Sequence, residues 1–548
     1  ITANGNATQG SFGPFARPDG EWGWNFDGDG DYLTVADSTE FDFGTGNFTI
    51  EGWINPAVTS GFKAIFSIGS PVQIYSYNNT VIAYFNDEDN TSTYTINGLG
   101  GPSSSVPANT WAHFAVVRNG NTYTTYVNGV AGSSQTSSDT VASSGSAPAI
   151  GTYLPAPTTY EFNGHISNLR LVKGTAVYTS NFTPSTSKLT AITNTKLLTC
   201  QSNRFIDNSA SGHAITPTGT PAVTAFGPFL TSSVYDPAVN GASAYLDGNG
   251  DYLSIANSSD FNLAANDFCF EFWFWCDSLA QYDTILSLYN TWAIEQESSG
   301  GGIKIAMWIS SGSSGSWDLL SAGIMSNLLK VNEWNHLVIA RTGNTLKSYH
   351  NGAIVYNSSF SGTIGSSSNI LYSGTFDTSA YWWDGYISDV KLSNGSTGGI
   401  NVSGNTITVP TAPLAVTDSN TKLLLNMKDG QAIDSAAQNN LTLVGNTDTS
   451  TGQAKFGNTS LFYDGSGDGA YYANGSSLGT GDWTIETFLW VNDFDANLGV
   501  FQYGGADGAL GSLILTNQKI RVLSSNVAAR LDTSGTINAQ TWYHVAYV

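Results

Sequence analysis

Three Asp-rich turns are the first residues in the sequence whose types and spacing could bind a ligand. Each precedes an aromatic strand, and their oxygen-bearing positions are Asp27, Asp29 and Asp31, then Asp247, Asn249 and Asp251, then Asp464, Ser466 and Asp468. Ca²⁺ prefers about six to eight oxygen ligands, so a calcium site is one interpretation. Asp-Gly pairs are also common in hairpin turns, which is the other interpretation. No cofactor is required by either.

A second repeated pattern pairs acidic residues and histidines with aromatic ones. A glutamate stands two residues before an aromatic, and a histidine stands two residues after a tryptophan, in three places each: Glu51, Glu271, Glu486, His113, His336 and His544. Glycoside hydrolysis needs a second carboxylate at about 5 to 10 Å, and none follows two or five residues later. No nucleophilic Ser, Cys or second His accompanies the histidines. We therefore expect structural roles, with each glutamate paired with a neighbouring polar group on its sheet face and each histidine packed and hydrogen-bonded, and we expect no enzyme.

Aromatic side chains outside these strands are the best candidates for ligand contact. Flat rings stack on the apolar faces of sugars, and exposed aromatic patches mark interaction sites. Aromatic residues also fill the cores of β-sandwiches, so burial is the alternative. The candidate residues are Trp22, Trp24, Trp292, Trp308, Trp317, Tyr381, Trp382 and Trp383.

These residues sit inside a sequence that is written nearly three times. The strand block NFTIEGWI near residue 47 returns as DFCFEFWF near 267 and as DWTIETFL near 482, and W-x-H blocks follow each in the same order. The opening text ITANGNATQGSFGPF also returns as ITPTGTPAVTAFGPF from Ile215. Repeats of this length indicate whole domains in series. We expect units at 1–190, 191–415 and 416–548, the first lacking its first strand and the third its C-terminal strands.

The local pattern within each unit is that of β-strands. In FTIEGWI, Phe48, Ile50 and Ile54 alternate with Thr49 and Trp53, as in a strand with one buried face. Asn-Gly pairs such as Asn128-Gly129 favour tight hairpins. The prediction is an all-β chain of tandem antiparallel two-sheet β-sandwiches of jelly-roll type.

Composition narrows the possible partners. The formal net charge is −23, so the phosphate backbone of nucleic acid and an anionic membrane surface would repel the chain. No apolar run reaches 18 residues, so membrane insertion is not expected. Cys269 and Cys276 lie seven residues apart, on opposite faces of a straight strand, and should be unbridged core residues.

The order of DGxGDYL, NFTIEGW, the W-x-H block and GHISNLRL resembles laminin-G-like, concanavalin-A-like modules. The linking text NTKLLTCQSNRFIDNSASGHAITPTGTPAVTAFGPF, from Asn194, is similar to segments in structural proteins of marine tailed bacteriophages, including cyanophages. The resemblance implies an extracellular, virion-surface protein that contacts other virion structural proteins. Related modules often bind calcium at sandwich edges.

The leading hypothesis is a virion-surface adhesin or fibre that binds cell-surface polysaccharide through serial modules and forms a homo-oligomer of unspecified order. Capsid or tail decoration modules without glycan binding are one alternative. A bacterial surface adhesin is another, and a glycan-degrading enzyme would require two carboxylates facing one cleft.

Overall fold

The computed structural model describes most of the chain. Described are residues 2–427 except 6, 19, 88–93, 144 and 230–236, and residues 442–548 except 445–446, 451, 454, 456–459, 472–481, 483, 495–497, 504–510 and 525–526. The chain divides into two compact units, the first formed by residues 1–428 with 435–438 and the second by 429–434 with 439–548. Each unit is considered by itself.

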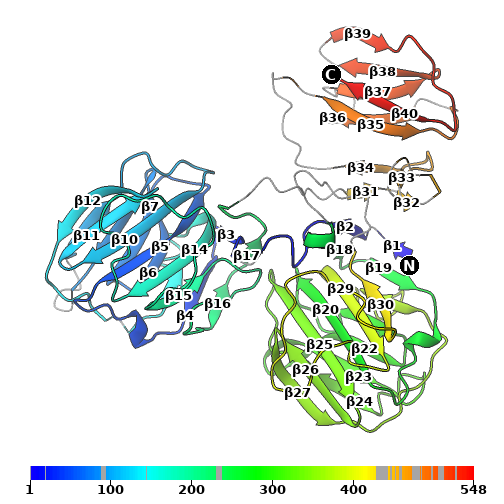
Figure 1. Ribbon diagram of the computed structural model, residues 1–548, viewed down its shortest axis with the longest axis horizontal. Helices are drawn as coiled ribbons and strands as arrows, with labels where there is room; N and C mark the ends of the chain where they lie inside the picture. The colour runs from blue at the N-terminus through cyan, green and yellow to red at the C-terminus, as the bar shows by residue number, and fades with distance from the viewer. Residues whose placement is uncertain are drawn as a thin grey trace. The chain divides into compact units, whose positions relative to one another are not determined.

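The first unit holds two β-sandwiches, each made of one seven-stranded and one eight-stranded antiparallel sheet (Figure 1). In the first sandwich the seven-stranded sheet has the order β16 (Ile215–Thr218), β4 (Tyr32–Val35), β13 (Pro148–Ile150), β6 (Phe62–Ile68), β7 (Val72–Tyr77), β8 (Thr80–Phe85), β9 (Ile96–Gly100). The facing sheet has the order β12 (Val130–Thr136), β11 (Thr122–Val127), β10 (Ala112–Asn119), β5 (Phe48–Pro56), β14 (Asn163–Lys173), β3 (Gly23–Asp27), β17 (Ala222–Thr224), with β15 (Thr195–Thr199) also on β14.

The second sandwich repeats this arrangement strand for strand. Its seven-stranded sheet has the order β1 (Thr2–Asn4), β19 (Tyr252–Ile255), β28 (Leu371–Ser373), β21 (Thr284–Leu288), β22 (Trp292–Ser299), β23 (Gly302–Ile309), β24 (Leu320–Ile324). The facing sheet has the order β2 (Thr8–Gly10), β18 (Ser243–Asp247), β29 (Asp384–Asn394), β20 (Phe268–Cys276), β25 (Trp334–Thr342), β26 (Thr345–His350), β27 (Ala353–Ser359), with β30 (Thr421–Leu425) also on β29. Short helices are η1 (Thr39–Phe41), η2 (Ser259–Phe261) and α1 (Pro237–Asn240).

The repeated sequence blocks form the central strands, as predicted. On β5, Phe48, Ile50 and Ile54 are fully buried in the core between the two sheets. The turn between β11 and β12 is made by Asn128 and Gly129, which have φ of 49° and 77°. Asn and Gly tolerate this left-handed region, which the twist of a two-residue hairpin requires.

Both long central strands, β14 and β29, carry a bulge at the same place. Asn168 and Asp389 have φ of 52° and 51°, and the register against β5 and β20 shifts beside them. Their side chains accept backbone N–H groups, Leu189 for Asn168 and Leu414 for Asp389. These bonds hold the chain that follows each sandwich against its own sheet.

Strand membership differs from the predicted unit boundaries. Strands β15, β16 and β17, which lie after residue 190, complete the first sandwich, whereas β1 and β2 from the start of the sequence complete the second. The alternation of apolar residues could locate these strands but not their partners, because partner choice depends on contacts between segments far apart in the sequence.

The second compact unit contains only β-strands among its described residues. Its pairings are β31 (Thr442–Val444) with β34 (Gly469–Tyr471), β32 (Asp448–Ser450) with β33 (Ser460–Phe462), and β35 (Ile485–Trp490) with β40 (Trp542–Tyr547). A further sheet runs β36 (Leu498–Tyr503), β37 (Gly511–Thr516), β38 (Lys519–Ser524), β39 (Val527–Asp532). Val491, Ile520, Ile537 and Val545 form its small core.

The three cysteines are buried and unbridged, as predicted for Cys269 and Cys276. Cys269 packs in a small cluster outside the sandwich, and Cys276 packs in the main core of the second sandwich. The two residues therefore face opposite sides of β20. Within the described part of the chain, no helix has the length and apolarity needed to cross a membrane.

Candidate functional site

The outer face of the seven-stranded sheet in the first sandwich carries a cluster of aromatic rings. Strands β7 and β8 alternate strictly, so Val72, Ile74 and Phe85 enter the core while the intervening residues face outward. The outward rings of these strands meet rings from β6 and from two loops. We call this set the tyrosine platform: Phe62, Tyr75, Tyr77, Tyr84, Tyr94, Tyr153 and Tyr160.

The tyrosine platform is a continuous layer of rings. Phe62 stacks on Tyr77 at 4.2 Å between ring centroids, and Tyr84 lies 4.8 Å from Tyr94. Tyr75 lies beneath them and is only 4% exposed, whereas the other rings are partly open to solvent. A layer of this kind offers flat apolar surface bordered by hydroxyl groups.

Gln73 fixes the polar groups at one end of the platform. Its Oε1 accepts a hydrogen bond from the Tyr75 hydroxyl at 2.7 Å, and its Nε2 donates to the Ser70 carbonyl at 2.8 Å and to the Tyr94 hydroxyl at 3.2 Å. Burial, followed by the neighbouring tyrosines, raises the pKa of Tyr75, so its hydroxyl stays protonated. The rings are therefore held in place before any ligand arrives.

The second sandwich has an aromatic layer at the matching position. Trp308 on β23 faces outward as Tyr84 does on β8, and Phe376 and Tyr381 occupy the loop that holds Tyr153 and Tyr160 in the first sandwich. We call the set the tryptophan platform: Tyr282, Tyr289, Trp308, Trp317, Phe376 and Tyr381. Successive ring centroids lie 5.2 to 6.3 Å apart.

Carboxyl groups lie beside the tryptophan platform. Glu295 replaces Tyr75 at the matching position and is 6% exposed. Burial, reinforced by the nearby charge of Glu297, raises the pKa of Glu295 to about 8. Burial and then Asp384 raise the pKa of Asp283 to about 7. At neutral pH Glu295 is therefore mostly protonated and Asp283 is about half protonated, so both carboxyl groups can donate as well as accept hydrogen bonds.

The aromatic residues that the sequence predicts as exposed ligand contacts are only partly those of the two platforms. Trp22, Trp24, Trp292 and Trp383 are at most 1% exposed and fill the cores, so the expectation that they are exposed is wrong. Trp308 and Trp317 lie in the tryptophan platform, and Trp382 is half-buried beside Tyr381. The tyrosine platform was missed, although the alternation Gln73, Tyr75, Tyr77 on a strand could have signalled it.

In the two sandwiches of the first unit, the repeated glutamates and histidines lie on the other sheet and are closed off from solvent. Glu51 Oε1 accepts from Arg170 Nη2 at 2.6 Å, and Glu51 Oε2 lies 3.3 Å from His113 Nε2 and accepts from the Tyr178 hydroxyl at 2.7 Å. Burial alone would raise the pKa of Glu51, but the hydrogen bond from His113 and the charge of Arg170 outweigh it and lower that pKa.

The contacts of the glutamate with a histidine and a cation recur in the second sandwich, where Lys391 takes the place of Arg170. Glu271 Oε2 lies 2.7 Å from Lys391 Nζ, and Oε1 lies 3.3 Å from His336 Nε2. Burial outweighs the attraction of Glu271 and lowers the pKa of His336, which is neutral at pH 7. In the second compact unit Glu486 and His544 meet at 3.0 Å but are exposed. The two networks of the first unit are buried ion pairs beneath loops, as the structural interpretation predicted.

The acidic turns direct their oxygens toward the backbone. Asp27 Oδ1 accepts from the N–H of Asp29 at 2.7 Å, and Asp31 Oδ2 accepts from the N–H of Asp27 at 3.1 Å. Asp31 Oδ1 also accepts from the N–H of Thr220 at 2.6 Å, which belongs to the segment that carries β16 and β17. Asp247 with Asn249 and Asp251, and Asp464 with Ser466 and Asp468, repeat the two internal bonds.

These hydrogen bonds are enough to explain the conformation of the acidic turns without a bound cation. Among the described residues, no three His, Cys, Asp or Glu side chains form a group suited to a metal ion. Calcium at Asp27, Asp247 or Asp464 and their neighbours remains a prediction.

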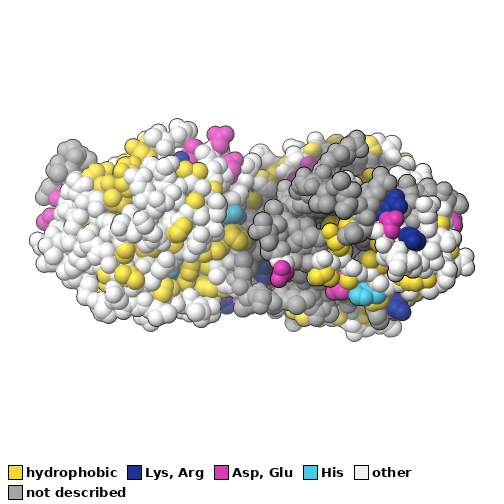
Figure 2. All heavy atoms as spheres, turned by 90° about the horizontal axis from the view of Figure 1, so that it is seen from above, with side chains coloured by type: hydrophobic (Ala, Val, Ile, Leu, Met, Phe, Trp, Pro, Cys, Tyr) yellow, Lys and Arg dark blue, Asp and Glu magenta, His cyan; other side chains and the backbone are white. Residues whose placement is uncertain are grey.

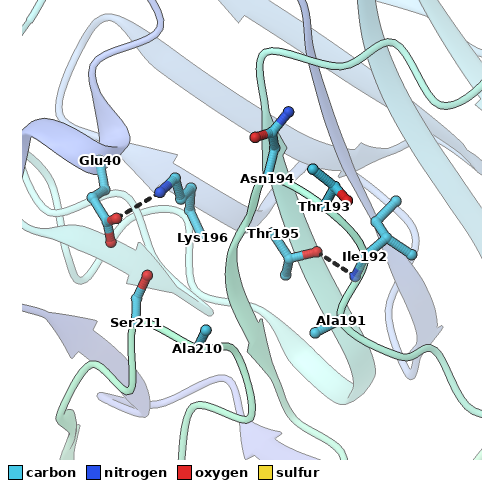
Figure 3. A pocket seen from close by; sticks show the side chains of 9 residues that line it. All are labelled: Glu40, Ala191, Ile192, Thr193, Asn194, Thr195, Lys196, Ala210 and Ser211. Atoms are coloured by element: carbon cyan, nitrogen blue, oxygen red, sulfur yellow. Dashed lines mark hydrogen bonds and ion pairs between the residues drawn. The ribbon is translucent and has the colours of Figure 1, made fainter.

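A shallow pocket of about 600 Å³ lies between η1 and β15 (Figure 3). It is lined by an ion pair, Lys196 Nζ to Glu40 Oε1 at 2.7 Å, and by small polar side chains. Hydrogen bonds from Lys196, Ser211 and His213 lower the pKa of Glu40 to about 2. No aromatic ring lines this pocket, and its charged groups are already paired, so it is a weaker ligand candidate than the platforms.

The sequence profile of the concanavalin A-like lectin/glucanases superfamily, in its laminin-G form, matches residues 27–176 and 247–398, which are the two sandwiches of the first unit. The chain belongs to this superfamily. No curated protein sequence matches the chain.

Several solved structures are similar in part. Domains LG4-5 of the mouse laminin alpha1 chain show 10% identity, with 68% of this chain and 88% of that chain covered and a TM-score of 0.24. A heptameric SAP-like pentraxin from Limulus polyphemus shows 13% identity over 39% and 98%, with a TM-score of 0.29. Domain 4 of the arabinanase AbnA from Geobacillus stearothermophilus, in complex with arabinotriose, shows 17% identity over 28% and 71%, with a TM-score of 0.23.

Proposed function

We propose that the chain is a non-catalytic, carbohydrate-binding adhesin or fibre component of a virion surface, with the tyrosine and tryptophan platforms as its glycan sites. The observation that carries the proposal is the recurrence of an open aromatic layer at matched positions of two sandwiches in a lectin-type family. Aromatic rings with fixed polar neighbours suit the alternating apolar and hydroxyl surfaces of a sugar.

The surface chemistry supports a neutral ligand for the first sandwich. Only 11% of residues are charged, and charged side chains are sparse on the face in Figure 2. The tyrosine platform offers hydroxyl and amide groups but no ionised side chain among its members. Weak binding at each platform would become strong on a repetitive polysaccharide through avidity.

The absence of catalysis is part of the proposal and is supported by the burial of the Glu51 and Glu271 networks, whose glutamate side chains are at most 5% exposed. A carboxylate that hydrolyses a glycosidic bond must reach the substrate. Incubation of the chain with any glycan it binds should therefore release no reducing ends.

A glycan array with the full chain tests the proposal. The chain should bind at least one cell-surface polysaccharide, and Tyr84→Ala with Trp308→Ala should abolish the signal, while Tyr471→Ala, at an exposed tyrosine outside both platforms, should leave it unchanged. Absence of binding to every glycan, with or without Ca²⁺, would refute it. Antibodies against the chain should label virus particles if the virion assignment is right.

A second candidate is a structural spacer of a capsid or tail. The strands that the two sandwiches draw from distant parts of the chain favour it, because they join the sandwiches through backbone hydrogen bonds. Unchanged particle adsorption by the double platform variant, together with loss of assembled particles on deletion of the chain, would select the spacer over the adhesin.

A further inference from the structure

The central hairpins of the two platforms match residue for residue, so the two sheet faces can be compared position by position. In the first sandwich Gln73 on β7 lies opposite Tyr84 on β8, and in the second sandwich Ala293 on β22 lies opposite Trp308 on β23. Tyr84 and Trp308 therefore occupy the same site of the two faces.

Two tyrosines of the first face are replaced by glutamates in the second. Two positions further along β7 and β22 stand Tyr75 and Glu295, and two positions beyond these stand Tyr77 and Glu297. Residues two apart on a strand share a face, and Ile294, one position before Glu295, enters the core. The tryptophan platform therefore carries two carboxyl groups where the tyrosine platform carries two phenol hydroxyls.

Glu295 lies among the rings of the tryptophan platform. Trp308 is its diagonal neighbour across the β22–β23 pair, and Thr284 is directly opposite it on β21. The backbone N–H of Thr284 donates to the Tyr381 carbonyl at 3.1 Å, and its hydroxyl donates to the Tyr282 carbonyl at 2.9 Å. A positive group that rests on these rings is therefore close to the Glu295 carboxyl, where the low polarity of the surroundings strengthens the attraction.

The hydrogen-bond partners of the two glutamates are uncharged. Thr284 Oγ1 donates to Glu295 Oε2 at 3.4 Å, and Gln281 Nε2 donates to Glu297 Oε1 at 2.6 Å. Lys304 stands opposite Glu297 on β23, yet in the described part of the chain no lysine, arginine or histidine lies at ion-pair distance from either glutamate. The sheet face does not itself neutralise them.

The loops that border the rings are acidic as well. Asp318 directly follows Trp317, and Asp377 directly follows Phe376. Both tryptophan-platform rings named here therefore have a carboxylate as their neighbour in the chain. The charge around the platform is negative and complements a positive ligand.

The raised pKa of Glu295 reflects the same imbalance. Burial is the larger cause and the charge of Glu297 the second, and together they raise the pKa to about 8, although Thr284 and Trp308 oppose the shift from the neighbouring strands. A positive charge on the platform would balance the charge of Glu297 and stabilise the ionised form of Glu295.

We infer that the tryptophan platform binds an amino sugar in its protonated form, with the ammonium group over the rings and beside Glu295 and Glu297. The inference rests on the proposed glycan-binding function and adds the charge class of the sugar for one of its two sites. Tryptophan and tyrosine rings attract an ammonium group to their faces, and a carboxylate forms a charge-assisted hydrogen bond with it. A neutral sugar leaves the carboxyl groups without a cation, and an acidic sugar is repelled.

Isothermal titration with two oligosaccharides that differ in one group tests the inference. One is a linear oligomer of glucosamine, and the other is its N-acetylated counterpart, which has the same linkage and rings but no charge. The full chain carries Tyr84→Ala, so that the tyrosine platform does not contribute. At about pH 6.5 and low salt, the glucosamine oligomer should bind at least about tenfold more tightly. Added salt should weaken the binding of this oligomer alone, because ions screen the attraction between charges.

Variants at the two glutamates assign the preference to the platform. With Glu295→Gln and Glu297→Gln added together, the two oligomers should bind equally, because an amide keeps the shape of the carboxyl group without its charge. Glu486→Gln makes the same exchange at an exposed glutamate of the second compact unit and should leave the preference unchanged. Trp308→Ala should remove the binding of both oligomers. Circular dichroism shows whether each variant is folded, and the salt dependence tests the charge requirement without any change at the glutamates.

The outcomes separate this inference from the proposed function. Equal affinity for the two oligomers, or a preference that survives both glutamine substitutions in a folded chain, refutes the inference. Binding of neither oligomer, while a neutral polysaccharide binds, also refutes the inference and leaves the proposed function intact. Binding of no glycan at all refutes both.

Discussion

Replacement of Gly219 by alanine should destabilise the first sandwich far more than replacement of Gly30. Both glycines have φ in the left-handed region, 77° and 86°, where a Cβ costs about 1 to 2 kcal/mol. A Cβ on Gly30 meets nothing within 4 Å, so Gly30→Ala should cost only that amount. A Cβ on Gly219 meets the Gly30 carbonyl at 2.6 Å, and backbone must move.

The extra cost for Gly219 has two parts. Overpacking against backbone costs about 1 to 3 kcal/mol. The movement also lengthens the bond from Thr220 N–H to Asp31 Oδ1, now 2.6 Å, and a hydrogen bond to a charged group contributes about 1.5 to 3 kcal/mol. Added to the cost of the left-handed φ, these parts give an expected loss of at least about 3.5 kcal/mol for Gly219→Ala, against about 1 to 2 kcal/mol for Gly30→Ala.

Differential scanning calorimetry measures the difference as the fall in the melting temperature of the unit that contains the first sandwich. At about 2 to 4 °C per kcal/mol for a domain of this size, the melting temperature should fall by at least roughly 7 °C in Gly219→Ala and by a few degrees in Gly30→Ala. Equal losses in the two variants would show that residues 215–229 do not dock on the acidic turn, and would refute the reasoning.

Three further predictions concern buried groups. Lys391→Met leaves Glu271 buried without its cation and should lower the unfolding free energy by about 3 to 5 kcal/mol, measured by urea titration. Glu486→Gln, at the exposed counterpart of Glu271, should change the unfolding free energy by less than about 0.5 kcal/mol. Glu295 has a folded-state pKa of about 8, above its unfolded value, so the contribution of this group to stability falls as pH rises from about 4.5 to 8. The Glu295→Gln variant should therefore melt at a higher temperature than the parent at pH 8 and at the same temperature as the parent at pH 4. The three cysteines should resist a thiol reagent in the native chain and react fully in urea; fast labelling of any of them would contradict their burial.

The fold class follows from local sequence pattern. Alternation placed Phe48, Ile50 and Ile54 on one face, and the Asn128-Gly129 pair fixed a hairpin, since both signals act over a few residues. The partner of an edge strand depends instead on a match between distant segments. The similarity of residues 1–15 to 215–229 was visible in the sequence, but which sandwich each would join was not.

The candidate site could be predicted only in part because residue type does not report exposure. Trp292 and Trp308 belong to neighbouring strands, yet the first enters the core and the second faces solvent. The sequence around Tyr84 shows no repeated motif that marks a site. The β7–β8 hairpin places Tyr84 opposite Gln73, and loop residues such as Tyr160 reach the same face from elsewhere in the chain. Only the assembled sheet reveals that layer of rings.

Isothermal titration of the full chain with a polysaccharide identified on the array tests the central claim most directly. With Tyr84→Ala and Trp308→Ala combined, binding should fall roughly 5- to 150-fold, since each stacked ring contributes about 0.5 to 1.5 kcal/mol and the two platforms act together on one polysaccharide. Circular dichroism would show that both sandwiches remain folded. Binding unchanged in that folded double variant would contradict the account.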